Sequence, residues 1–297
     1  MTRSDSGQSA RSSLIKVLAT IPHFFEAGGA QHGSLAADPA LRLAAFSSNL
    51  TQLHRNFSQK QGMFDITSSA IYQVNQALNL EIDVVVLTTR DKHVLDRLSL
   101  PERITFKHEA TDVEPMLLGF ECLKVHKREA GRYDFHCYLE DDLSIPDPWF
   151  FRKLEWFNQS FGDDKVLMPN RFEVASSAPF DKVYVDGNMP RHWIESFQDL
   201  SVEPAISAKF LGQNIEFFRP PNPIGPGFYL NSNQFSKWAS QAYFLDYDQR
   251  FIGPIESSYT LGILKTFQVY KSSPANACFL EVHHLDNRYL DKRLRFD

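Results

Sequence analysis

The 297-residue sequence is poor in cysteine and has no long hydrophobic run. Its three cysteines, Cys122, Cys137 and Cys278, include no CxxC pair, which argues against a disulfide framework or a thiolate zinc site. The polar, Ser-rich start lacks the apolar core of a secretory signal, and no stretch approaches the roughly 18 apolar residues of a membrane span. We therefore expect a cytoplasmic protein with buried free thiols.

An excess of basic charge is also missing, as are several common catalytic motifs. The net charge of −5 at pH 7 gives no reason to expect nucleic acid or an anionic membrane as an obligate partner. The sequence has no GxxxxGK(S/T) loop, no GxGxxG, no HExxH and no GxSxG. These absences exclude most nucleotide hydrolases, dehydrogenases, zincins and serine hydrolases.

The first half of the chain alternates apolar runs with amphipathic segments. Apolar runs predict strands over residues 14–20, 82–88, 104–107 and 135–139. Apolar spacing predicts helices over 39–57, 69–78, 91–98 and 111–130. This alternation predicts an α/β fold with an open parallel sheet and right-handed crossovers, in which ligands bind beyond the carboxyl ends of the strands.

The second half is less regular. We expect helices over residues 147–161, 232–239 and 255–267 and strands over 165–169, 183–185, 228–230 and 278–282. Residues 187–226 hold many aromatics and prolines without a clear period. They are either a mobile acceptor region or a helical insert.

The clearest chemical signal is the acidic triplet Glu140-Asp141-Asp142, which directly follows the expected strand 135–139. Carboxylates at a strand end must be solvated, paired or bound to a cation. Oxygen ligands suit Mg²⁺ or Mn²⁺, which complete their coordination shells with phosphate and water. A solvated acidic turn is the alternative, and the strand context favours the metal site.

This triplet resembles the acidic motif of GT-A glycosyltransferases, whose general form is DxD, and is especially similar to the EDD variant of the N-acetylglucosaminyltransferase I type. The resemblance implies a GT-A fold, which is Rossmann-like with a mostly parallel central sheet flanked by helices. It implies that Asp142 binds the metal and that Glu140 and Asp141 face the ribose and the metal's water shell.

The resemblance extends to the order of elements from about residue 14 to 285. It implies one catalytic domain over residues 14–297 after a disordered tail of residues 1–13. Within this domain, residues 14–145 form the nucleotide-binding half and residues 146–297 the acceptor- and sugar-binding half.

Two loops match the nucleotide-binding loops of GT-A enzymes by position. Thr20, Pro22 and His23 lie at the end of the first expected strand, where these enzymes hold the base and ribose. At the end of the second, Asp91 is placed to bond the base and Arg90 the phosphates. Ordinary loop polarity and helix capping are the alternative.

A histidine doublet, His283-His284, follows the last expected strand. Several GT-A enzymes complete the metal site with a C-terminal histidine, and histidine is a common metal ligand. Because adjacent strand residues point to opposite faces, only one of the two is expected to reach the metal or diphosphate.

Glu256 follows a Gly-Pro turn at the expected start of a helix. Its place resembles that of the carboxylate base that deprotonates the acceptor hydroxyl in inverting GT-A enzymes. The alternative is a carboxylate that only stabilises the first helical turn. Asp246 and Asp248 are second-choice bases.

Glycines and aromatics supply the remaining candidates. Gly225 and Gly227 lie in a turn of the kind that lines the sugar pocket in GT-A proteins, or form a plain turn. Asn170 and Arg171 are candidates for the donor sugar or phosphate. Trp193, Phe197, Phe217 and Phe218 either stack on an acceptor sugar or, as we favour, pack in the core.

Together these residues predict a metal-dependent transfer from a nucleotide-diphosphate sugar, with a UDP-sugar as the favoured donor and inversion at the anomeric centre. Expected partners are the donor and a carbohydrate or lipid-linked glycan acceptor, with peripheral membrane contact in the latter case. Two alternatives remain: a sugar-nucleotide pyrophosphorylase, and a catalytically silent GT-A-like sugar-nucleotide-binding protein.

Overall fold

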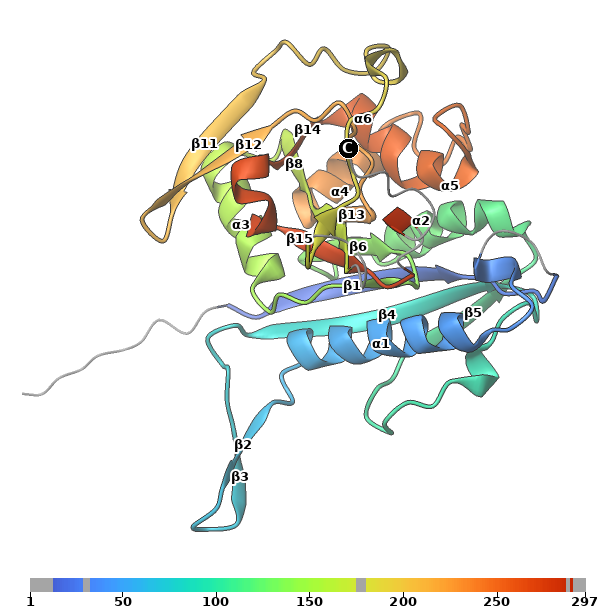
Figure 1. The fold of residues 1–297 in the computed structure, drawn as a ribbon, viewed down its shortest axis with the longest axis vertical. Helices are drawn as coiled ribbons and strands as arrows, with labels where there is room; N and C mark the ends of the chain where they lie inside the picture. The colour runs from blue at the N-terminus through green and yellow to red at the C-terminus, as the bar shows by residue number, and fades with distance from the viewer. Residues whose placement is uncertain (1–12, 29–32, 175–179, 287–288, 291–297) are drawn as a thin grey trace, which may run out of the picture.

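The computed structural model describes residues 13–28, 33–174, 180–286 and 289–290. At its centre is a five-stranded sheet in the order β13-β6-β1-β4-β5 (Figure 1). Its strands are β1 (Ile15–His23), β4 (Leu80–Thr89), β5 (Lys107–Thr111), β6 (Phe135–Leu139) and β13 (Gly227–Asn231). All neighbours are parallel except β13 and β6. The predicted α/β architecture with a mostly parallel, helix-flanked sheet is confirmed.

Helices cover both faces of this sheet. The helices α1 (Ala40–Phe57) and α3 (Phe150–Phe161) pack on one face, and α2 (Leu118–Arg128), α4 (Ser232–Ala239) and α6 (Gly262–Thr266) pack on the other. In β1, Val17 belongs to the first layer of core residues and Leu18 to the second. Because both faces are buried, β1 is apolar along most of its length rather than alternating.

Two smaller sheets are built mainly from the second half of the chain. One has the order β10 (Val183–Tyr184), β9 (Asn170–Glu173), β15 (Glu281–His284) and β7 (Leu143–Ser144). The other has the order β11 (Ala205–Phe210), β12 (Gln213–Phe218), β14 (Gln268–Ser272) and β8 (Lys165–Met168). The β15–β7 pairing brings His284 opposite Leu143, directly after the acidic triplet.

Short helical segments join these elements. They are η1 (Gly33–Leu35), η2 (Leu95–Arg97), η3 (Pro115–Leu117), η4 (Arg191–Trp193), α5 (Pro254–Glu256), η5 (Ser257–Leu261, a π-helix) and η6 (Pro274–Phe279). Among the described residues, no helix combines the length and the apolar character needed to cross a membrane. The expected tail of residues 1–13 lies outside the described residues apart from Ser13.

The strands β1 and β6 separate at their carboxyl ends. Their pairing ends at Thr20 and Tyr138, whereas β1 stays paired with β4 as far as His23. Pro22 lies beyond the β6 pairing, so its missing N–H costs no hydrogen bond on that side. The chain passes from β1 to β4 and β5 on one side and returns to β6 on the other, which makes this the topological switch point where open α/β sheets bind ligands.

The predicted helix over residues 69–78 is wrong. Residues in this segment form β3 (Ala70–Gln73), which pairs with β2 (Gly62–Asp65) in a hairpin that projects from the body (Figure 1). Ser69 and Asn75 adopt positive φ values of 54° and 60°, which a continuous right-handed helix excludes. The apolar side chains of the hairpin are exposed on both of its faces, so their spacing did not mark a core-facing stripe.

Other boundaries were also predicted wrongly. The region 187–226 is not a helical insert, because it contains the β11–β12 hairpin paired to β14. The strand expected over 278–282 begins at Glu281, after η6, and the strand expected at 104 begins at Lys107. The helix expected over 91–98 is only the short turn η2. Local apolar spacing did not reveal these pairings, which depend on distant strands.

A pair of buried histidines lies where α2 packs on the central sheet: His126 belongs to α2 and His136 to β6. The hydroxyl of Thr20 is 2.9 Å from Nε2 of His126, and Nδ1 of His126 is 3.1 Å from Nδ1 of His136. Burial lowers the pKa of His136 to about 4, and burial together with the neighbouring His136 lowers the pKa of His126 well below its ordinary value. Both rings therefore fold in the neutral form.

We predict that unfolding becomes easier as the pH falls below 6.5. The unfolded state binds protons on both histidines from about pH 6.5, whereas the folded state resists them until about pH 4 for His136, so stability is lost across this window. Within this window, each histidine lowers the free energy of unfolding by about 1.4 kcal/mol for each pH unit of acidification. Urea titrations at pH 7 and pH 5 measure this. The His126→Gln/His136→Gln variant should lose much of the dependence, and an unchanged slope in it would contradict the assignment.

Candidate metal and donor site

The acidic triplet lies at the carboxyl end of β6. The side chains of Asp141 and Asp142 are almost fully buried, and Glu140 is half-buried. The backbone is held on both sides: Asn49 on α1 donates to the carbonyl of Glu140 at 3.0 Å, and the Leu285 N–H donates to the carbonyl of Asp142 at 2.8 Å. Buried carboxylates require charged partners or hydrogen bonds, and here the partners come from β1, α1 and β15.

Asp141 is held by His23 and Arg42. His23 Nδ1 is 2.5 Å from Asp141 Oδ2, and Arg42 Nη2 is 2.5 Å from Oδ1. The Val94 N–H donates to His23 Nε2 at 3.2 Å, so Nε2 is the unprotonated nitrogen and Nδ1 carries the proton donated to Asp141. The ring of His23 also stacks on Phe46 at 4.6 Å. His23 therefore holds the carboxylate of Asp141 in position from the end of β1.

Asp142, His284 and Asp286 form a potential metal-binding group. Each offers one ligand atom, and these atoms all lie within 4.8 Å of one another. His284 Nε2 is 3.7 Å from Asp142 Oδ2, and the same oxygen accepts a hydrogen bond from Arg42 Nη1 at 3.1 Å. Two carboxylates and an imidazole are a ligand set that Mn²⁺ or Mg²⁺ with a phosphate ligand accepts.

The orientation of His284 fits a metal ligand. Its Nδ1 lies 2.6 Å from Glu173 Oε1, while its buried Nε2 makes no hydrogen bond within the part of the chain that the structure describes. Glu173 is fully buried and also accepts from the backbone N–H of Leu290 at 2.9 Å. A carboxylate that binds one ring nitrogen and directs the other outward is the usual support of a metal-bound histidine.

The charges of this group are strongly coupled. Burial opposes charge on His284, but its interactions with the carboxylates of Asp142 and Glu173 outweigh burial and raise the pKa of His284 to about 9. Burial would raise the pKa of Glu173, and the hydrogen bond from His284 leads the interactions that lower it instead. A metal ion at Nε2 takes the place of the proton there, because metal binding requires the neutral ring.

His283 points to the other face of β15. Its ring stacks on Phe172 with the centroids 4.8 Å apart and the planes 3° apart. Burial lowers its pKa, and it is not part of the group of potential ligands. The alternation of side chains along the strand thus directs one histidine of the doublet, His284, toward Asp142.

Glu256 lies in the first turn of a continuous helical segment formed by α5, η5 and α6. It is half-buried, and its carboxylate lies near the buried Tyr259. Burial raises the pKa of Tyr259, and the negative charges of Glu140 and Glu256 raise it further. Glu140 and Glu256, which belong to different elements, therefore both act electrostatically on the same buried tyrosine.

The second-choice bases are engaged elsewhere. Arg250 and Lys265 donate to Asp248 at 2.7 Å and 2.9 Å, and the bond from Arg250 leads the interactions that hold the pKa of Asp248 far below its usual value. Asp246 lies 4.0 Å from Lys265 and accepts from the Asp248 N–H. Their ion pairs fix a surface turn next to α6.

Residues of the two predicted nucleotide loops take different places. Thr20 is buried and bonded to His126, which turns its side chain into the core. Pro22 is half-buried near the carboxyl end of β1. Arg90 is exposed, with a positive φ of 51° and an ion pair to Asp112 at 3.4 Å, and Asp91 is exposed beside it.

The turn at Gly225 and Gly227 fits closely against the strand that carries the acids. A Cβ on Gly227 would lie 1.8 Å from the carbonyl oxygen of Tyr138, and its φ is 136°. Because β13 pairs with β6 here, only glycine permits the approach. A Cβ on Gly225 would meet the Gly227 oxygen at 3.1 Å and the Met168 sulfur at 3.2 Å.

A buried charge cluster lies beside this turn. Arg171 Nη2 and Lys271 Nζ bind opposite oxygens of Asp186 at 3.0 Å and 3.1 Å, and Lys271 also donates to the carbonyl of Ile224 at 2.7 Å. The Arg171 guanidinium lies 5.1 Å from the ring centre of Tyr289. Asn170 instead bonds to the carbonyls of Ser272 and Ala277.

The predicted acceptor aromatics are divided between the core and the surface. Phe217 is fully buried and Phe197 packs edge-on against Phe251. Phe218 is half-buried in β12, and Trp193 is 42% exposed. Among the four, Trp193 retains the most open ring face.

Three residues of this site were not expected from the sequence: Arg42, Glu173 and Asp286. Asp286 had a local signal, because His284-Leu285-Asp286 spaces two ligands on one side of a strand end. Arg42 and Glu173 had none, since one lies 100 residues before Asp142 and the other 111 residues before His284. Only the fold brings them to the acids.

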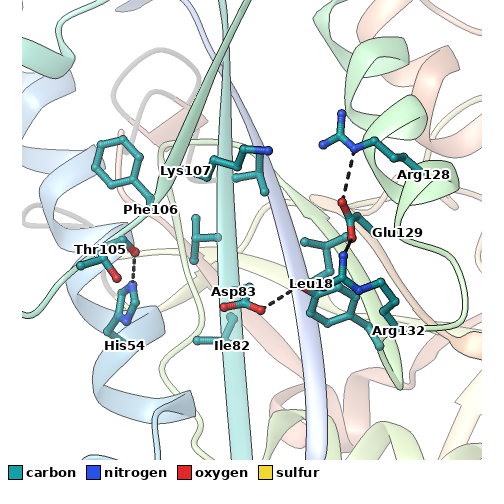
Figure 2. Close-up of a pocket in the computed structure, with 13 residues that line it drawn as sticks. Leu18, His54, Ile82, Asp83, Thr105, Phe106, Lys107, Arg128, Glu129 and Arg132 are labelled. Carbon is teal, nitrogen blue, oxygen red and sulfur yellow. Dashed lines mark hydrogen bonds and ion pairs between the residues drawn. The ribbon is translucent and has the colours of Figure 1, made fainter.

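A cavity of about 430 Å³ lies away from these residues, at the amino-terminal half of β4 (Figure 2). Its charged lining groups are paired with one another: the Tyr133 hydroxyl donates to Asp83 at 2.8 Å, and Arg132 binds Glu129. His54 bonds to the Thr105 carbonyl at its rim. The cavity lies at the opposite end of the strands from the acids.

No protein-family model and no curated protein matches the chain. Similar solved structures include GalNAc-T7 with UDP, GalNAc and Mn²⁺, matched over 91% of this chain and 44% of that one at 10% identity and a TM-score of 0.45. Another is S. aureus TarS, matched over 88% of this chain and 35% of that one at 10% identity and a TM-score of 0.41. This chain thus spans less than half the length of either.

We predict that His284→Ala lowers Mn²⁺ affinity about 10–100-fold, whereas His283→Ala changes it little. Nε2 of His284 lies in the ligand group, and the ring of His283 stacks on Phe172 on the other face. Mn²⁺ titration followed by electron paramagnetic resonance measures both. Equal losses in the two variants would contradict the assignment.

Proposed function

We propose that the chain is a metal-dependent glycosyltransferase of the GT-A type that transfers a sugar from a nucleotide-diphosphate donor to a hydroxyl acceptor. The observation that carries the proposal is the buried Nε2 of His284, directed by Glu173 toward Asp142 at the switch point of a mostly parallel sheet. Residues 14–145 supply the nucleotide half and residues 146–297 the sugar and acceptor half of one domain.

Asp142, His284 and Asp286 would hold the ion, Mn²⁺ or Mg²⁺. Such an ion would supply positive charge against the negative charge of the leaving diphosphate. Asp141 stays bonded to His23 and Arg42, so its role is to fix the geometry at the end of β6. Glu140 is half-buried at the same edge of the sheet. We assign it to contact the ribose or the water shell of the metal.

The donor is assigned to the space between the end of β1 and the turn at Gly225. We assign the base and ribose to the Pro22 end of β1, with Asp91 on the base, and the phosphates to Arg90; both Arg90 and Asp91 are exposed at the carboxyl end of β4. The sugar is assigned to the side of Gly225, next to the cluster of Arg171 and Lys271. We favour UDP as the carrier by analogy with the fold.

Glu256 is assigned as the base that takes the proton of the acceptor hydroxyl, which gives inversion at the anomeric carbon. Its support is the position of its carboxylate near Tyr259, a residue on which Glu140 also acts electrostatically. The exposed ring of Trp193 is a candidate stacking surface for a carbohydrate or lipid-linked glycan acceptor. A lipid-linked acceptor brings the protein into peripheral contact with a membrane.

We predict that UDP-sugar binds this protein only in the presence of Mn²⁺ or Mg²⁺. Thermal-shift and calorimetric titrations with UDP-, GDP- and CMP-sugars test this, because a ligand specific for the folded state raises its melting temperature. Asp142→Asn should abolish the metal-dependent increase in UDP-sugar affinity and in melting temperature. Asp164→Asn is the control, because this carboxylate is 81% exposed, pairs with Lys237 and lies outside the ligand group. Equal donor affinity with and without metal would reject the proposal.

We predict that Glu256→Gln lowers kcat about 10²–10⁴-fold, the usual size of a general-base contribution, with donor affinity nearly unchanged. The donor is held by the metal and the acids, so the loss should appear in the chemical step. Single-turnover kinetics beside donor calorimetry separates the two quantities. Asp246→Asn serves as the matched control, and unchanged turnover in Glu256→Gln would reject this residue as the base.

A further inference from the structure

Arg42 occupies an unusual position among the acids. It lies in the first turn of α1 and bridges both carboxylates, with Nη2 2.5 Å from Asp141 and Nη1 3.1 Å from Asp142. Its side chain is 16% exposed, and its Nε is buried without a hydrogen bond among the described residues. The guanidinium is therefore held at the acids and still touches solvent.

The two contacts of Arg42 differ in what else holds the acid. Asp141 has a second partner in His23, so this end of the bridge is anchored whether or not a ligand is bound. Asp142 Oδ2 is shared between Arg42 Nη1 and the nearby Nε2 of His284, which belongs to the ligand group. A divalent ion that took Asp142 Oδ2 as its ligand would compete with the guanidinium for that oxygen.

The competition has an electrostatic cost. Two cations within a few ångströms repel each other, and the repulsion is stronger in a partly buried site than in water. It is relieved when an anion binds to both. A diphosphate is such an anion, and the planar fork of arginine pairs with phosphate oxygens in a bidentate manner.

We propose that Arg42 couples metal binding to diphosphate binding: it satisfies Asp142 in the metal-free protein, yields that oxygen to the ion, and donates to the donor's diphosphate while its other arm stays on Asp141. This inference rests on the proposed function and adds a second diphosphate-binding cation, from α1, to the metal site. Arg42 thus disfavours metal alone and favours metal together with a nucleotide diphosphate.

The test measures Mn²⁺ and UDP binding separately in the purified full chain. Mn²⁺ alone is titrated by electron paramagnetic resonance, and UDP by calorimetry at saturating Mn²⁺. In Arg42→Ala, Mn²⁺ alone should bind about fivefold more tightly or better, and UDP about tenfold more weakly, within the range of typical coupling between sites. Arg42→Gln keeps part of the aliphatic stem and serves as a second variant in case the alanine variant folds poorly. It should also bind Mn²⁺ alone more tightly and UDP more weakly than the wild type.

Arg55→Ala is the matched control, because Arg55 is exposed in the last turn of the same helix and should leave both affinities unchanged. Mn²⁺ affinity that is unchanged or lower in the Arg42 variants overturns the coupling role while the proposed metal site stands. UDP affinity that is unchanged overturns the diphosphate contact. A wild-type chain that binds no Mn²⁺ overturns the proposed metal site and this inference together.

Discussion

The burial of Asp141 and Asp142 at the end of β6 is the constraint on which the site depends. Buried carboxylates are tolerated only when cations and hydrogen-bond donors meet them, and here the donors come from β1, α1 and β15. Each of these elements packs on or beside the central sheet through apolar side chains. The core thus sets the distances at which the charged groups meet.

The second half of the chain completes the site by pairing with the first. β15 runs antiparallel to β7, which places His284 opposite Leu143, and the Leu285 N–H binds the carbonyl of Asp142. Glu173 reaches His284 because β9 lies on the other edge of β15. β13 closes the far edge of the central sheet, where Gly227 permits its close approach to Tyr138. The site is therefore assembled from strands of two sheets.

Periodicity predicted the long elements well because their packing is repetitive. The apolar runs of β1, β4 and β6 reflect burial on both faces, and α1 carries its apolar stripe over five turns. It failed at residues 69–78, where the apolar side chains of the hairpin are exposed, and at β14, whose partners β8 and β12 are distant in sequence. Strand pairing is a non-local property, so a local window did not contain it.

The sequence by itself determined the α/β class, the acidic triplet at a strand end and the rule that only one histidine of the doublet faces it. These depend on local facts: burial of a strand, the chain order and the alternation of side chains. The tertiary structure decided which histidine that is, and added Arg42, Glu173 and Asp286 to the acids. Charged partners separated by about 100 residues are chosen by how elements pack, and that choice is not written in any short segment.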